Sequence, residues 1–340
     1  MLNPALRRMS ALAAGGVLAA AALTGCAITQ SAGPSGSEDS LKIAFLTASS
    51  ANTWLAASLD AMQEEAEAEG VEIVEFDGKF EPGLQPRQIQ DVIAAGTYDG
   101  IILAAIDGTG AIPGIEDALD AGLEVVILNQ VVGDALDTAD PQVEGVAASV
   151  LAPPQATGER LGELALSACE GTDPCRVVYM YGLRGTPYDT AVRTGFDSVI
   201  AQHPAIEVIA EGEGGFLGTD EPLKATQDIL QAHPGFEVFV GTGDQHVRGA
   251  LLAFQDAGVD SVKTIGVGAS EPAIAAIADG TWFADVAGAP KDEGRVAFAA
   301  ILAAIRDGEH LGGIDVTTEL PDGGLITSEN VADFRAQWAG

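Results

Sequence analysis

Polar and aromatic side chains follow the short apolar runs of this sequence, at the points where strands would end. Amide and carboxylate groups can orient the hydroxyl groups of a small solute, and flat aromatic side chains can stack on a ring. The pattern therefore favours a binding site for a small polar molecule. The strand-end candidates are Ser49, Ser50, Asn52, Trp54, Asp107, Asn129, Gln130, Arg184, Tyr188, Asp189, Thr242, Asp244 and Gln245.

Each candidate has a plain structural alternative. Asn52, Asp107 and Asp244 could equally cap the helices that follow them. Trp54 could be a core residue of its helix, and Arg184 could be a solvated surface charge. The hypothesis of a binding site depends on the convergence of the whole set at one edge of the fold, because no single residue carries it.

The sequence lacks the motifs that hold a cofactor or perform catalysis. Residues 47–52 read Thr-Ala-Ser-Ser-Ala-Asn, so neither a dinucleotide-binding nor a phosphate-binding glycine loop follows the first apolar run. No Gly-x-Ser-x-Gly elbow supplies a nucleophile. We therefore expect no cofactor, no metal site and no enzyme, although an exported enzyme on an α/β scaffold is the competing class. The histidines are scattered, at His203, His233, His246 and His310.

Short apolar runs alternate with stretches of helical spacing along most of the chain. The helix after the first run carries Leu55, Leu59 and Met62 at helical spacing, and Gly70 should end it. Two such series, separated by Pro153-Pro154, predict an α/β fold of two doubly wound parallel-sheet lobes, with ligands bound beyond the carboxyl ends of the strands. The predicted strands are 41–47, 71–77, 101–106, 125–128, 176–181, 206–210, 236–240 and 263–267.

The N-terminus has the pattern of an export signal. Arg7 and Arg8 precede an uncharged apolar stretch, 11–23, which is too short to span a bilayer stably. Leu-Thr-Gly-Cys at 23–26 is typical of a bacterial lipoprotein, in which Cys26 would become the lipidated first residue. A plain soluble signal is the alternative. We expect a signal peptide over 1–25, a Ser-, Gly- and Pro-rich tether over 26–40, and a location outside the cytoplasm, anchored to the membrane by lipid.

Charge narrows the set of partners. The formal net charge is −34, and loss of Arg7 and Arg8 with the leader brings it to −36. Such a surface repels nucleic acid, because proteins bind nucleic acid through basic patches.

Cys169 and Cys175 flank a short turn-rich segment and could pair in an oxidising compartment or remain free thiols. We favour the disulfide.

Beyond these separate features, the chain from residue 41 to 331 resembles the type I periplasmic binding proteins of the ribose-binding group, which deliver solutes to ABC importers. The motifs that carry the resemblance are Lys-Ile-Ala-Phe-Leu-Thr (42–47) with Asn52-Thr-Trp54, Tyr98-Asp-Gly-Ile-Ile-Leu, Arg193-Thr-Gly-Phe196, Ala232-His-Pro234, Gly243-Asp-Gln with Gly249-Ala-Leu251, and Leu325-Ile-Thr-Ser-Glu-Asn330. The lactose-type repressors share this fold, but here an export leader occupies the place of their DNA-reading segment.

The resemblance implies particular contacts. Asn52 matches a position that holds sugar hydroxyls, Trp54 one that stacks on the ring, and Phe216 or Leu217 the opposing aromatic residue of the second lobe. Asn129-Gln130 replaces an Asp-Arg pair, and Thr190 stands where an Arg is expected. Small residues at three further contact positions suggest a roomier pocket, or one that uses backbone groups; they are Gly243, Gly268 and Gly288.

The resemblance also implies the domain plan and the role. Three hinge crossings are expected near 151–153, 288–290 and 316–321, between one lobe of 41–150 with 290–315 and another of 151–289 with 316–340. The expected function is capture of a sugar, polyol or similar small polar solute by hinge closure and its presentation to an ABC permease, by a monomer. The alternative is a sensor that passes its closed form to a membrane receptor and binds a non-carbohydrate molecule.

Overall fold

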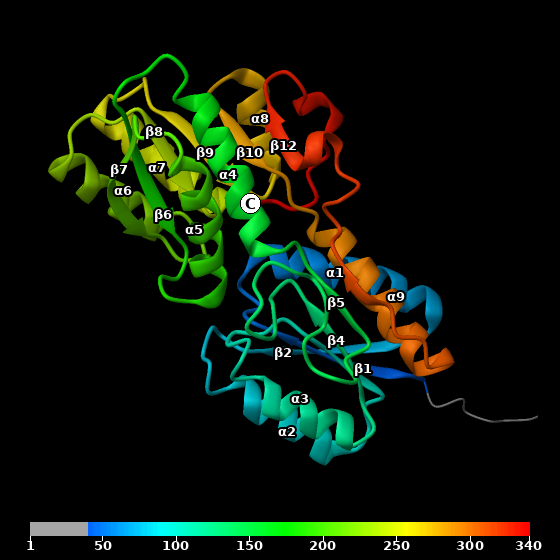
Figure 1. Ribbon diagram of the computed structural model, residues 1–340. Helices are drawn as coiled ribbons and strands as arrows, with labels where there is room; N and C mark the ends of the chain where they lie inside the picture. Colours follow the sequence, from blue (N-terminus) through cyan, green and yellow to red (C-terminus); the bar gives the residue numbers. More distant parts are fainter. Residues whose placement is uncertain (1–39) are drawn as a thin grey trace, which may run out of the picture. The chain divides into compact units, whose positions relative to one another are not determined.

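The computed structural model describes residues 40–340, and the predicted signal peptide, Cys26 and nearly all of the predicted tether lie outside the described residues. The described chain forms two six-stranded sheets, each covered by helices on both faces (Figure 1). The predicted α/β class with two doubly wound lobes is confirmed. None of the helices within the described residues combines the length and hydropathy needed to cross a bilayer.

The first sheet is entirely parallel, in the order β11-β5-β4-β3-β1-β2. Helices α1 and α9 pack on one face through Leu55, Met62 and Ile301, while α2 and α3 pack on the other through Ile89 and Ile115. The elements are β1 (Lys42–Thr47), α1 (Thr53–Glu69), β2 (Glu72–Asp77), α2 (Gln85–Ala95), β3 (Gly100–Leu103), α3 (Ile112–Asp120), β4 (Glu124–Leu128), β5 (Ala148–Val150), α9 (Pro290–Asp307) and β11 (Gly312–Ile314).

The second sheet has the order β12-β10-β9-β8-β6-β7. Helices α4 and α5 cover one face through Leu161 and Phe196, and α6, α7 and α8 cover the other through Ile229, Phe254 and Ile277. The elements are α4 (Pro154–Ala168), β6 (Cys175–Tyr181), α5 (Pro187–Ile200), β7 (Ile206–Glu213), α6 (Asp220–Ala232), β8 (Val238–Gly241), α7 (Asp244–Ala257), β9 (Lys263–Val267), α8 (Glu271–Asp279), β10 (Ala284–Val286), η1 (Pro321–Gly324), β12 (Leu325–Thr327) and η2 (Val331–Asp333).

The chain passes between the two sheets three times, at 151–153, 287–289 and 315–324. One strand departs from the predicted parallel pattern, because β12 pairs antiparallel with β10. Strand β10 runs toward the crossing and leaves its sheet there, whereas the chain re-enters the sheet at β12 from the first lobe. Strand β12 therefore runs antiparallel to β10 at the edge of the second sheet.

Local sequence signals explain the ends of α1. The Asn52 side-chain oxygen accepts a hydrogen bond from the Leu55 amide at 3.0 Å, as an N-cap does. Gly70 ends the helix with a φ of 68°, a backbone conformation that glycine adopts without a steric penalty. The structure moves some predicted bounds: β8 begins at Val238 rather than at residue 236, and β3 ends at Leu103 rather than at residue 106.

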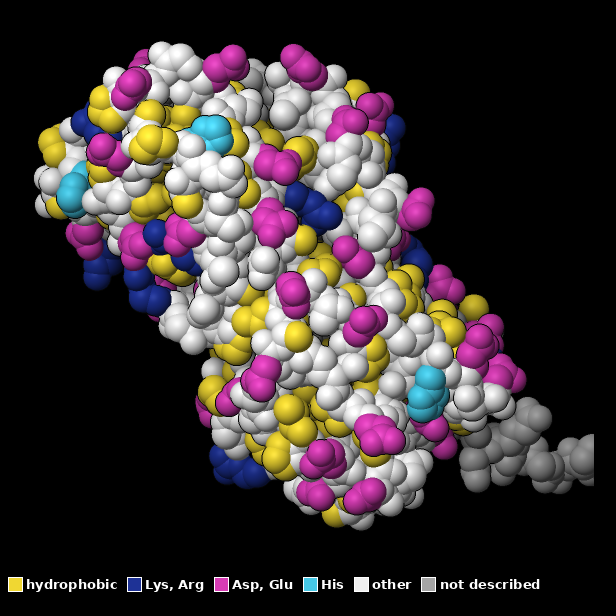
Figure 2. All heavy atoms as spheres, in the orientation of Figure 1, with side chains coloured by type: hydrophobic (Ala, Val, Ile, Leu, Met, Phe, Trp, Pro, Cys, Tyr) yellow, Lys and Arg dark blue, Asp and Glu magenta, His cyan; other side chains and the backbone are white. Residues whose placement is uncertain are grey.

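Acidic side chains are spread over the visible face of both lobes, with few basic ones between them (Figure 2). This distribution agrees with the formal charge of −34 and with a solvated surface. Within residues 40–340 no group of three or more His, Cys, Asp or Glu side chains is placed to hold a metal ion.

Cys169 and Cys175 form a disulfide that joins the end of α4 to the start of β6. Both residues lie in the core of the second lobe, packed with residues such as Ala165 and Val177. The bond therefore closes the short turn that connects a buried helix to a buried strand.

We expect the double substitution Cys169→Ser and Cys175→Ser to lower the free energy of unfolding by about 2 kcal/mol, because it removes a loop constraint from the unfolded chain. Denaturant unfolding measures this change, and ligand affinity should stay the same. Reductant should weaken the wild-type protein by a similar amount and leave the double variant unaffected. Equal stability of variant and wild type would contradict the structural role.

Candidate ligand-binding site

A cavity of about 250 Å³ lies between the lobes, at the carboxyl ends of both sheets. Its wall combines five aromatic rings with side-chain amides, and no charged side chain of the described chain lines it. Such a lining suits an uncharged solute, because an ionised ligand would lose water without gaining a counter-charge. The aromatic residues are Trp54, Phe80, Tyr188, Phe216 and Trp338, and the amides are Asn52, Asn129, Gln130 and Gln245.

Several of the residues predicted from the sequence lie in this lining, and each follows a strand. Asn52 and Trp54 follow β1, and Asn129 and Gln130 follow β4. In the second lobe Tyr188 and Phe216 come after β6 and β7. The structure thus brings these strand-end groups together where the rule for open α/β sheets places ligands. Thr242 and Gln245, which the strand-end pattern also included, line the cavity after β8.

Asn52 takes the capping role that the sequence left open, lines the cavity and also contacts the other lobe. Its side-chain oxygen caps α1, while its Nδ2 donates to the Phe216 carbonyl of the other lobe at 3.1 Å. The Phe216 loop is held in turn by His246, whose ring bonds the Gly215 carbonyl at 2.6 Å. Burial lowers the pKa of His246 to about 4, so the imidazole is neutral at ordinary pH.

A buried carboxyl that the sequence did not reveal supports the first-lobe wall. Glu293 Oε2 accepts from Trp54 Nε1 at 2.8 Å and from Asn129 Nδ2 at 3.2 Å. Asn129 Oδ1 then accepts from Gln130 Nε2 at 2.9 Å. Burial raises the pKa of Glu293 to about 7, against the opposing effect of the bonds from Trp54 and Asn129. One titratable group therefore orients three side chains of the cavity wall.

Two of the small residues do not enlarge the cavity as expected. A Cβ at Gly288 would lie 2.1 Å from the ring of Trp54, and a Cβ at Gly268 would lie 2.5 Å from that of Trp338. The space that these glycines provide is therefore filled by indole rings. Gly243, the third, does line the cavity.

Two predicted residues lie outside the lining, and each accepts a hydrogen bond from a backbone amide of its own turn. Ser49 is buried, and its hydroxyl accepts from the Ala51 amide at 3.3 Å. Asp107 is exposed and accepts from the Gly110 amide at 3.0 Å, within the turn before α3; the N-cap of that helix is Ala111, so Asp107 does not cap it.

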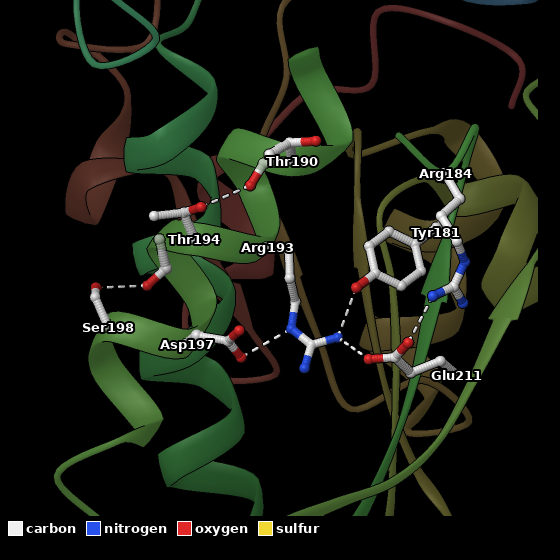
Figure 3. Close-up of polar contacts among 9 residues, drawn as sticks. Tyr181, Arg184, Thr190, Arg193, Thr194, Asp197, Ser198 and Glu211 are labelled. Carbon is white, nitrogen blue, oxygen red and sulfur yellow. Dashed lines mark hydrogen bonds and ion pairs between the residues drawn. The ribbon is translucent and has the colours of Figure 1, made fainter. Parts of the chain in front are cut away.

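Arg184 and Thr190 also lie outside the lining, at exposed positions of the second lobe. Figure 3 shows Arg184 beside Tyr181 and Glu211, and Thr190 on helix α5. The Arg184 guanidinium pairs with Glu211 at 2.6 Å and sits over the Tyr181 ring at 4.2 Å. Arg193 joins the same cluster through Glu211 and through the Tyr181 hydroxyl at 2.7 Å. The Arg184 side chain therefore belongs to an ion-pair cluster on the surface.

Asp244 lies beneath the cavity in a buried carboxyl pair. Its Oδ2 accepts from the Ser270 amide at 2.7 Å, and the neighbouring Asp285 accepts from the Ala269 amide at 3.1 Å. Burial raises the pKa of both carboxyls, and the proximity of Asp244 raises that of Asp285 further. Two adjacent buried carboxyls do not ionise together, so Asp244 supports the 268–270 turn rather than a ligand.

Among the lining residues that sequence reasoning missed are Phe80 and, near the C-terminus, Trp338. Trp338 lies in the C-terminal segment, where no apolar periodicity indicated a position in the fold. The only sequence signal for Trp338 is its large aromatic side chain. Glu293 gave no signal either, because it occupies an ordinary place in an amphipathic helix.

Two α/β lobes that enclose an uncharged, aromatic-lined cavity define a two-lobed solute-binding protein. A family described as the periplasmic binding protein domain matches residues 43–310, and the chain belongs to this family of binding proteins. The predicted family membership is confirmed, and it places the protein outside the cytoplasm.

Three similar proteins illustrate the family. The galactofuranose-binding protein YtfQ of Escherichia coli is 27% identical over 227 residues, which cover 66% of this chain and 69% of YtfQ. The ribose import binding protein RbsB of Escherichia coli is 24% identical over 254 residues, 74% of this chain and 80% of RbsB. An ABC transporter solute binding protein from Mycobacterium smegmatis, solved with bound glycerol, is 27% identical with a TM-score of 0.75 and covers 88% of this chain and 99% of that one.

We expect Glu293→Gln to flatten the pH dependence of stability. The ordinary pKa of this carboxyl is 4.5 and the folded value is about 7, so ionising it costs the folded state more as the pH rises through that interval. Wild-type stability should therefore fall by about 3 kcal/mol from this group between about pH 5 and pH 8. Glutamine keeps an oxygen acceptor for Trp54 and Asn129 but has no proton to lose.

Denaturant unfolding at about pH 5, 6.5 and 8 measures the difference. Glu67→Gln, on the exposed face of α1, is the matched control and should follow the wild-type curve. A smaller, residual slope is expected in Glu293→Gln, because the Asp244–Asp285 pair remains. The assignment fails if Glu293→Gln also follows the wild-type curve.

Proposed function

We propose that this protein is the solute-binding component of an ABC importer and captures a neutral sugar or polyol between its two lobes. The observation that carries the proposal is the cavity itself, whose wall combines aromatic rings and amides from both lobes without a charged side chain among the described residues. The bound solutes named for the relatives and the solved structure are galactofuranose, ribose and glycerol, which are neutral and rich in hydroxyl groups.

The proposed ligand contacts divide by chemistry. Trp54 and Phe216 offer flat faces to a ring or carbon chain, from the first and the second lobe respectively. Gln130, Tyr188 and Gln245 offer hydrogen-bonding groups to hydroxyls. Burial raises the pKa of Tyr188, so its hydroxyl stays protonated and can donate. We do not include Ser49, Asp107, Arg184, Thr190 or Asp244, whose contacts lie elsewhere.

Capture follows from contacts made to both lobes at once. The lobes proposed to move are 41–150 with 290–315 and 151–289 with 316–340, and strand membership of the two sheets supports this division. A solute that binds both lobes stabilises the closed arrangement, and only that differential affinity can shift the equilibrium. The closed form then presents the solute to a permease.

The proposal extends to the attachment of the protein. The sequence pattern around Cys26 supports a lipid anchor and removal of residues 1–25, and the protein would act as a monomer at the outer face of the membrane. The sensor alternative uses the same closure but a different membrane partner.

A thermal-shift panel of pentoses, hexoses, disaccharides, inositols, linear polyols and nucleosides tests the solute class. A ligand at a hundred times its dissociation constant should add about 2.7 kcal/mol to the stability of the folded state. For any sugar or polyol that binds, Tyr188→Phe should weaken binding by roughly two- to tenfold, because one neutral hydrogen bond is lost.

Tyr98→Phe is the matched control, since Tyr98 packs against Phe76 away from the cavity. Its affinity should equal that of the wild type. A folded protein that responds to no sugar or polyol would refute the proposed solute class and favour the sensor with a non-carbohydrate ligand.

A further inference from the structure

The C-terminal segment, residues 335–340, returns to the cavity and supplies part of its wall. Trp338 lines the cavity although only 5% of its surface is exposed. Its Nε1 donates to the Gly268 carbonyl at 2.7 Å, and its own carbonyl accepts from the Glu271 amide at 3.0 Å. The residue is therefore fixed to the second lobe at the turn between β9 and α8.

The preceding residue ties the same segment to the first lobe. Gln337 Oε1 accepts from the amides of Lys291 and Asp292 at 3.0 and 3.1 Å, at the start of α9. Its Nε2 donates to the Asp292 carboxylate at 2.6 Å. Helix α9 packs on the first sheet, so the segment holds Trp338 between elements of both lobes.

Trp338 and Trp54 form one continuous indole wall. Their ring centres lie 5.5 Å apart in an edge-to-face arrangement, with 67° between the planes. The close approach of Gly268 and Gly288 to these rings leaves no room for a side chain at either glycine. The backbone at these two glycines therefore leaves space that both indole rings occupy.

The polar atoms of this wall are already used. Trp54 Nε1 donates to Glu293 and Trp338 Nε1 donates to the Gly268 carbonyl. The two rings therefore present only carbon and π surface to the cavity. A ligand hydroxyl placed against them would lose its water without finding a partner, whereas a methyl or C–H group would gain contact.

We propose that Trp338 is a specificity-determining residue, and that with Trp54 it selects a neutral solute whose group facing this wall carries no hydroxyl, as in a deoxy sugar. The inference rests on the proposed function and narrows its solute class. The amides and hydroxyls that follow the strands bind the hydroxylated part of the solute, and the indole wall binds the unhydroxylated part.

Matched pairs of sugars test the proposal by isothermal titration calorimetry on the purified protein. L-Rhamnose against L-mannose, and D-fucose against D-galactose, each differ by a methyl in place of a hydroxymethyl group. In at least one pair the deoxy sugar should bind about tenfold more tightly to the wild type, because the parent buries an unpaired hydroxyl. Trp338→Ala should remove this preference.

Two further variants separate specificity from folding. Trp338→Phe keeps an aromatic face and should retain most of the preference, even if Trp338→Ala lowers stability. Arg335→Ala alters the same segment at an exposed position and should leave both affinities unchanged. Denaturant unfolding of each variant reports its folded state independently of binding.

The outcomes distinguish this inference from the proposed function. If the sugars bind but Trp338→Ala leaves the ratio within each pair unchanged, or lowers both affinities equally, the inference is overturned and the proposed function stands. If the parent sugars bind as tightly as the deoxy sugars in the wild type, the inference is likewise overturned. If no sugar or polyol binds the wild type, the inference and the proposed function are both overturned.

Discussion

The buried carboxyl of Glu293 is the contact on which the first-lobe wall of the cavity depends. It lies in the first turn of α9, directly after the chain returns from the second lobe, and accepts from an indole of α1 and an amide that follows β4. Burying a carboxylate costs several kcal/mol unless strong partners compensate. Here the partners are neutral N–H groups, so the cost remains and appears as the raised pKa. A group that is costly for stability is typical of a site that must hold its shape.

Two contacts that join the lobes beside the cavity are individually weak, which suits the proposed opening and closing. Asn52 makes one neutral hydrogen bond to the Phe216 carbonyl, and Trp54 meets Trp338 edge to face. Each contact of this kind contributes about 1 kcal/mol. In the proposed mechanism, a solute that adds several contacts to both lobes outweighs these two and determines the closed state. Because the lining carries no charge among the described residues, a neutral solute of the proposed class would leave without separating an ion pair.

The sequence predicted those parts of the fold and site that depend on local rules. Alternating apolar runs located both sheets, and Asn52, Gly70 and the strand-end amides behaved as capping and α/β topology require. The sequence was less informative where the role of a residue depends on the direction in which its side chain points. Arg184 and Asp244 follow strands as ligand-binding residues do, but one turns to Glu211 on the surface and the other turns into the core toward Asp285. Neighbours distant in sequence set those directions.

The same limit explains why the size of the cavity could not be predicted from its small residues. Gly268 and Gly288 indicate space only if nothing else enters it, and the structure fills that space with rings from α1 and from the C-terminal segment. The shape of the cavity therefore depends on two parts of the chain. The strand ends are positioned by the fold, whereas the C-terminal segment has no periodicity and is positioned only by packing. In the proposed site these two sources act on different parts of the solute. Changes in the C-terminal segment could therefore alter which solute fits without disturbing the strand ends that bind its hydroxyls.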